Sequence, residues 1–150
     1  MSIIEKKRRP NHFTQWAAQF AVAGELCKRG YEVALTMGNH PSVDIMVRSP
    51  SNVEFSVDVK GLYRPNYWLM KKKASRINLF SVLAYVPVAE KNRFFVYDQA
   101  TANAEIDADI ARNRATAISK NRSPEKAGVM PGISWASASE YEGRWDLLPK

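Results

Sequence analysis

The stretch from Asn39 to Gly61 constrains the fold more than any other part of the sequence. Apolar and polar residues alternate on both sides of a short polar segment at 49–52. The alternating apolar residues are Val43, Ile45 and Val47 before this segment and Phe55, Val57 and Val59 after it. A period of two is typical of half-buried strands, and the sequence Ser-Pro-Ser-Asn is made of turn-forming residues. We therefore expect an antiparallel hairpin with one face in the core.

A hairpin centred on Ser51 brings two acids and a lysine together. Asp44 and Asp58 are equally far from this centre, so they lie opposite each other with Cβ atoms about 5 Å apart. Lys60 projects from the same face, because it is two residues beyond Asp58. Opposed carboxylates repel, and a divalent cation between them would offset the repulsion; oxygen ligands suit Mg²⁺ or Mn²⁺. The alternative is that both acids and the lysine are solvated on an exposed face.

The order of these residues resembles that of a known group of enzymes. Asp44 followed by Asp58-Val59-Lys60, after a helix that ends in Cys-Lys-Arg-Gly-Tyr at 27–31, resembles the PD-(D/E)xK nuclease superfamily and its small stand-alone endonuclease-like proteins. The resemblance implies a restriction-endonuclease-like fold and metal-dependent hydrolysis of DNA phosphodiesters. It also implies that Asp44, Asp58 and the Val59 carbonyl hold Mg²⁺ (or Mn²⁺), while Lys60 acts on the attacking water.

The first helix carries the main departure from the superfamily pattern. We expect a helix from about Thr14 to Arg29, capped by Asn11 or Thr14 and ended by Gly30. Its predicted apolar face consists of Phe13, Trp16, Ala17, Phe20, Ala23 and Cys27. Many members of the superfamily have a glutamate on this helix that completes the metal site. Here Gln19, at the edge of the predicted face, fits that position, whereas Glu25 lies on the solvent side.

A neutral amide at position 19 leaves a second function open. Glutamine can ligate a metal or donate a hydrogen bond, but it brings no negative charge. The alternative is therefore a weakened or inactive nuclease fold that binds nucleic acid or a protein partner.

Composition limits the class of protein. With 150 residues the chain has the size of one domain, which we place at 11–150, after a basic flexible arm at 1–10 containing Lys-Lys-Arg-Arg. We expect no membrane span, no secretory signal and, with Cys27 as the single cysteine, no disulfide framework, which favours a cytoplasmic protein. The net charge of +7 is compatible with a nucleic-acid partner. A homodimer is expected by analogy with nucleases that cut both strands.

The segment 61–76 mixes basic and aromatic residues. Arg64, Lys71, Lys72 and Lys73 are the candidate phosphate-binding residues, and neighbouring aromatic rings are suited to stack on bases. In one alternative Trp68 and Leu69 cover the core while the lysines face water. In another, exposed aromatics such as Trp68 form a surface for a protein partner.

The rest of the chain predicts further sheet and helix. We expect strands at 31–37, 79–88 and 93–97, a helix from Thr101, as its cap, to about Lys120, and a loop at 121–132. A capping box from Ser137 to Glu140 predicts a short terminal helix, with Tyr141, Trp145, Leu147 and Leu148 closing the core. The expected fold is mixed α/β: a helix, three strands, two strands, a helix and a short C-terminal helix.

Overall fold

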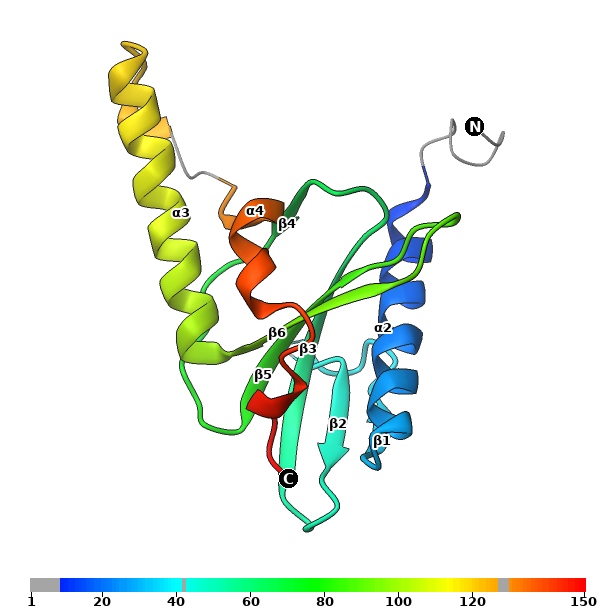
Figure 1. Cartoon of the computed structure of the whole chain (residues 1–150). Helices are drawn as coiled ribbons and strands as arrows, with labels where there is room; N and C mark the ends of the chain where they lie inside the picture. Colours follow the sequence, from blue (N-terminus) through cyan, green and yellow to red (C-terminus); the bar gives the residue numbers. More distant parts are fainter. Residues whose placement is uncertain (1–8, 42, 127–129) are drawn as a thin grey trace.

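The computed structural model of the chain describes residues 9–41, 43–126 and 130–150. Most of the basic arm expected at 1–10 therefore lies outside the described residues. The fold is mixed α/β, as expected: a sheet of five strands carries one long helix on each side, and a smaller sheet of two strands lies next to it (Figure 1).

The main sheet has the order β1-β2-β3-β5-β6. Its strands are β1 (Glu32–Leu35), β2 (Ile45–Arg48), β3 (Glu54–Leu62), β5 (Leu79–Tyr85) and β6 (Arg93–Asp98). All neighbours are antiparallel except β3 and β5, which are parallel. Every residue of β5 is buried, because both faces of this strand are covered, and this explains its continuous apolar run.

The register of the hairpin is the predicted one. Ile45 pairs with Val57 and Val47 pairs with Phe55, and one further step along this register places Asp44 opposite Asp58. The turn is closed by a hydrogen bond of 2.9 Å from the Asn52 N–H to the Ser49 carbonyl.

Helix α2 (Asn11–Lys28) begins earlier than expected and without a side-chain cap. Pro10 occupies the N-cap position, so the predicted caps are wrong: Asn11 is already helical, and Thr14 is buried one turn further on. The end is as predicted, since Gly30 adopts φ 89°, a left-handed conformation that favours glycine.

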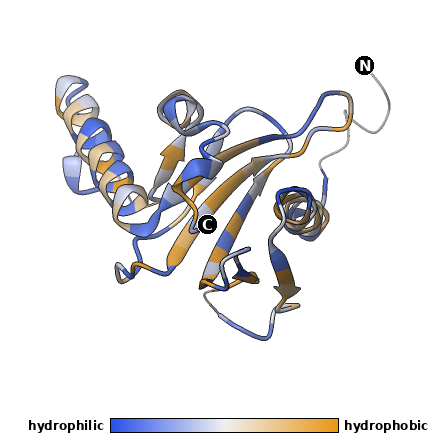
Figure 2. Ribbon diagram, turned by 60° about the horizontal axis from the view of Figure 1, so that its bottom comes forward, coloured by the Kyte–Doolittle hydropathy of each residue, from blue (hydrophilic) through white to orange (hydrophobic). Residues whose placement is uncertain are grey.

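The predicted apolar face of α2 is wrong except at Ala23, which is buried as expected. The buried residues are Thr14, Ala18, Gln19, Val22, Ala23 and Leu26, whereas Phe13 and Phe20 are 58% and 55% exposed. The cause is steric. At Gly61 of β3 an added Cβ would lie 2.7 Å from the Cβ of Ala18, so only small side chains let the helix approach the sheet this closely. Figure 2 shows α2 nearly end-on beside the sheet.

The segment 61–76 is not simply a loop. Strand β3 continues to Leu62, and β4 (Tyr67–Leu69) pairs with β7 (Gly132–Ser134). Trp68 is 1% exposed and packs against Phe95 and Trp135, with ring centroids 5.2 and 5.6 Å away. This tryptophan therefore belongs to the core, as one alternative had it, and cannot form a partner surface. Leu69, which that same alternative placed over the core, is 52% exposed.

Two further caps differ from the prediction. Helix α3 (Gln99–Ser119) is capped by Asp98, whose carboxylate accepts a hydrogen bond from the Thr101 N–H. Helix α4 (Trp135–Ala138) is capped by Ser134 and not by a box at 137–140. In both cases the true cap lies three residues before the expected one, because Thr101 and Ser137 supply the backbone N–H and not the accepting oxygen.

The C-terminal segment closes the core in short turns. Three 3₁₀ helices follow α3: η1 (Pro124–Lys126), η2 (Ser139–Tyr141) and η3 (Trp145–Leu147). Trp145 and Leu148 are buried against the α2 side of the sheet, as expected. None of the described helices is long and apolar enough to cross a membrane.

Candidate functional site

The candidate site lies where β2 ends and β3 continues with no strand on that side. The last backbone hydrogen bond across this edge runs from the Asp44 N–H to the Val57 carbonyl at 3.0 Å, and beyond it side chains take over. The Val59 N–H donates to Asp44 Oδ2 at 2.7 Å, and the Val59 carbonyl accepts from Gln15 Nε2 at 3.0 Å. This satisfies the backbone groups that the shorter strand leaves open, and it holds Asp44 beside Val59.

The two acids predicted to meet are brought together. Asp58 is 3% exposed and Asp44 is half-buried, and the two carboxyl groups are close enough to share a hydrogen bond. The alternative of two solvated acids is therefore wrong. Burial raises the pKa of Asp44, and the nearby Asp58 raises it further, while the Val59 N–H and the charge of Lys60 act in the opposite direction.

Two lysines contact Asp58, although only one was expected there. Lys60 Nζ lies 3.6 Å from Asp58 Oδ1. Lys73 Nζ lies 2.9 Å from Asp58 Oδ2, in an electrostatic contact and not an aligned hydrogen bond. A buried carboxylate is expensive to leave unpaired, so these two cations explain how Asp58 remains inside the sheet.

Lys73 is held in place by helix α3. The side chain of Asn103 accepts from the Lys73 N–H at 3.1 Å and donates to the Lys73 carbonyl at 2.6 Å. Gln99 Nε2 in turn donates to Asn103 Oδ1 at 2.9 Å. One asparagine thus fixes the backbone on both sides of the residue whose ammonium group reaches Asp58.

Gln19 joins the site from α2. Its Nε2 donates to Asp44 Oδ1 at 3.2 Å, while its Oε1 is buried without a hydrogen-bond partner. Glu25 takes no part: it is paired with Lys28 and Arg29 on the helix surface.

The oxygen atoms near Asp44 are of the chemical type that a hard divalent cation prefers. Asp44 and Asp58 supply two carboxylates, the Val59 carbonyl has a second lone pair, and the unpartnered Gln19 Oε1 is a fourth donor. Over the described residues no group of three or more histidine, cysteine or acidic side chains is placed to hold a metal ion. With both acids ionised, the set carries two negative charges, one fewer than a glutamate at position 19 would give.

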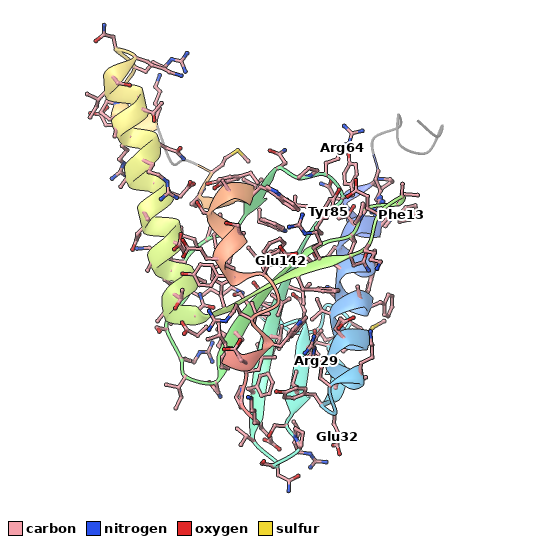
Figure 3. The ribbon with its side chains drawn as sticks, viewed as in Figure 1. Phe13, Arg29, Glu32, Arg64, Tyr85 and Glu142 are labelled. Atoms are coloured by element: carbon pink, nitrogen blue, oxygen red, sulfur yellow. The ribbon has the colours of Figure 1, made fainter. Side chains whose placement is uncertain are left out.

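The other basic residues of 61–76 do not all face this site. Lys72 pairs with Asp107 of α3 at 2.8 Å, and Lys71 is exposed. Arg64 lies over the ring of Tyr63, with its guanidinium carbon 5.3 Å from the centroid. Figure 3 shows Arg64 at the same end of the molecule as Phe13.

A cleft of about 310 Å³ opens beside the site between α2 and β4. Its wall includes Gln15, Lys60, Tyr63 and Tyr67. The cleft therefore connects the lysine next to Asp58 with the aromatic and basic segment that follows β3.

The sequence does not show how three further residues shape the site. Gln15 offers a usable signal, since it lies four residues before Gln19 and so shares its side of the helix. Lys73 is one of the predicted phosphate-binding residues, but its contact with Asp58 was not expected. Its clamp, Asn103, lies 30 residues away in the sequence, and no local pattern links the two.

Comparisons of the chain with protein-family models, with curated proteins and with solved structures find no match.

Proposed function

We propose that this protein is a divalent-metal-dependent deoxyribonuclease of the PD-(D/E)xK type. The observation that carries the proposal is the hairpin register that opposes Asp44 and Asp58, with Lys60 3.6 Å from Asp58. Two acids and a lysine gathered beside the end of β2 can serve the hydrolysis of a phosphodiester: the acids as ligands for a cation, and the lysine as a positive group beside the reacting phosphate.

Asp44, Asp58, the Val59 carbonyl and Gln19 Oε1 would hold Mg²⁺ or Mn²⁺. When bound, such a cation lowers the pKa of a coordinated water and neutralises charge on the phosphate. Lys60 orients the attacking water and contacts a phosphate oxygen. Lys73 places a second positive charge next to the other oxygen of Asp58. From there it would also stabilise the negative charge that develops on the phosphate in the transition state.

The substrate we assign is DNA that enters along the cleft next to Lys60. The guanidinium groups of Arg9 and Arg64 both lie over the ring of Tyr63 on its wall, 4.9 and 5.3 Å from the ring centroid. Basic groups neutralise phosphates, so we expect these two arginines to contact the DNA backbone. Lys71 and Lys72 extend the basic surface. Such contacts give salt-dependent binding without sequence preference.

A second function is favoured by two particular observations: the missing third charge at Gln19, and the contact of Lys73 with an oxygen that the metal would use. Both weaken metal binding. The second candidate is therefore a protein with a nuclease-like site that binds DNA and does not cut it.

The test is incubation with supercoiled plasmid and with single-stranded DNA in Mg²⁺, in Mn²⁺ and in a chelator. We expect cleavage in either metal and none in the chelator, and a loss of at least about 100-fold in Asp58→Asn. Asp146→Asn is the matched control, because Asp146 is an exposed acid paired with Arg144.

Equal cleavage by the wild type and Asp58→Asn would reject Asp58 as a metal ligand, and with it the proposed nuclease site. Retention of DNA that falls with salt, without any cutting, would establish the second candidate instead.

A further inference from the structure

The outer side of α2 is apolar, although no other element of the described residues covers it. Phe13, Ala17, Phe20, Gly24 and Cys27 are all exposed, and their spacing of four, three, four and three residues places them on one line along the helix. We call these five residues the outer seam. Figures 1 and 2 show that no other described helix or strand lies on this side of α2.

Such a surface is unusual for a helix that lies on a protein's exterior. The solvent side of an amphipathic helix normally carries charged residues, and a helix that is apolar all round is normally buried. The outer seam contains no ionisable acid or base apart from the thiol of Cys27, and the acid nearest to it in sequence, Glu25, is paired with Lys28 and Arg29. The sequence of α2 is thus that of a helix covered on both sides.

We propose that a second copy of this chain covers the outer seam, with the two α2 helices antiparallel. The spacing is that of a two-stranded coiled coil, in which apolar residues repeat alternately every three and four positions. A two-fold axis between Ala17 and Phe20 sets Phe13 of each copy against Gly24 of the other. The same axis sets Phe20 against Ala17. Each of these four layers then joins one ring to one small residue, so this part of the surface is complementary to itself, as a two-fold interface requires.

Gly24 supports this arrangement independently. A glycine inside a helix destabilises it by about 1 kcal/mol relative to alanine, so its presence calls for a steric reason. Within the described chain there is none, since an added Cβ at this position would have no atom within 4 Å. The facing ring of Phe13 from a second copy supplies one.

Charge and area define how strong the pairing is. The chain carries a net charge of +7, so two copies repel unless they meet through a neutral strip, which the outer seam provides. A phenylalanine side chain buries about 150–250 Å², so the exposed halves of four rings give roughly 400 Å². With the smaller residues the interface remains under the roughly 1,200 Å² of a standard complex. The dimer is therefore weak and reversible.

The first test is the dependence of molecular mass on concentration, measured by sedimentation from micromolar to millimolar protein. We expect the wild type to shift from monomer towards dimer, and Phe20→Glu to raise the dissociation constant by more than about 100-fold, because it removes two rings and opposes like charges. Ile118→Glu is the matched control: Ile118 is 62% exposed on α3 and should leave the dimer unchanged. Circular dichroism verifies that both variants are folded.

The second test fixes the direction of the helices through the single cysteine. In the antiparallel dimer the two Cys27 residues are about 17 residues apart along the axis, or roughly 25 Å at 1.5 Å per residue. A short bis-maleimide should therefore fail to join them. It should join two copies of Ala17→Cys made in a Cys27→Ser background, which lie near the two-fold axis.

Two results would overturn the proposal. One is a wild type that stays monomeric at millimolar concentration, since the seam would then serve a different partner. The other is efficient linkage through Cys27 without linkage at position 17, which means parallel helices. Neither depends on whether the protein cleaves DNA.

Discussion

Lys73 reaches Asp58 from outside the main sheet, and its Nζ lies 2.9 Å from Asp58 Oδ2. Lys60, the other cation at this acid, comes from the same strand as Asp58 and needs no special support. Lys73 follows β4 and depends on the double hydrogen bond from Asn103. The carboxylate of Asp58 therefore contacts two lysines, Lys60 from its own strand and Lys73, whose backbone is held by α3. A metal ion bound at Asp58 would compete with Lys73 for the same oxygen.

Replacing Lys73 by methionine should raise the affinity for Mn²⁺ by about tenfold, or about 1.4 kcal/mol. The reason is that the ammonium group and the metal are attracted to the same oxygen. Electron paramagnetic resonance of free Mn²⁺ measures this directly, without any nuclease assay. Retention of DNA should fall in the same variant, because a positive charge is lost.

Lys71→Met serves as the control for this variant, since Lys71 is exposed next to the same segment. It should weaken DNA retention to a similar extent and leave the Mn²⁺ affinity as it is. Unchanged Mn²⁺ affinity in Lys73→Met would mean that the lysine and the metal do not compete.

Gln19→Glu should lower the stability of the metal-free protein and raise its affinity for the metal. The amide donates to Asp44 Oδ1 at 3.2 Å, and a carboxylate of the same shape would repel it. Without metal we expect a loss of about 1–3 kcal/mol in the free energy of unfolding. With Mn²⁺ present the third charge should tighten binding by about tenfold.

Thermal unfolding with and without Mn²⁺ measures both effects of Gln19→Glu. Ala115→Glu adds the same charge at an exposed position of α3, outside both the site and the outer seam, and should not respond to Mn²⁺. Equal stabilisation of the two variants by Mn²⁺ would argue against a metal at Gln19.

Two glycine-to-alanine variants on opposite sides of α2 should have opposite effects. In Gly61→Ala the new Cβ would lie 2.7 Å from the Cβ of Ala18 and 3.0 Å from the Thr14 carbonyl oxygen, so we expect a loss of about 1–3 kcal/mol. In Gly24→Ala the Cβ has free space within the chain, and helix propensity should add up to about 1 kcal/mol. Urea unfolding of dilute protein compares them in the monomer.

The hairpin and its acids were predictable because two local signals together set the register. A slip by one residue would expose Ile45 and Val57, which are both fully buried, and the turn at 49–52 sets the centre of the hairpin, so the alternation and the turn together place Asp44 opposite Asp58. The buried run of β5 was predictable for the same reason: the burial of its side chains determines its sequence. For the hairpin and for β5, the local sequence pattern and the tertiary structure agree.

The helix face and the second lysine were not predictable in this way. Phe13 and Phe20 form a stronger apolar stripe than Ala18 and Val22, and nothing in the periodicity tells which stripe meets the sheet. That choice depends on Gly61, which lies in another element. Lys73 meets Asp58 only through the fold of α3 and β4, and β4 itself depends on β7, far along the chain.

The raised pKa of Asp44 predicts how stability changes with pH in the absence of metal. Burial is the main cause, with the nearby Asp58 adding to it. The folded protein therefore keeps a proton on Asp44 at pH values above 3.8, the ordinary pKa of the group, where the unfolded chain has lost it. When the folded state binds more protons, stability falls as pH rises through this window.

Asp44→Asn should remove this dependence, so that its melting temperature varies less than that of the wild type between about pH 4 and about pH 7. Mg²⁺ should reverse the slope in the wild type alone, because binding requires both carboxylates ionised and therefore strengthens as pH rises. Melting curves across this range, with and without Mg²⁺, measure both effects. Parallel curves for the two proteins would show that Asp44 titrates as a solvated acid, and a metal between it and Asp58 would then lose its electrostatic basis.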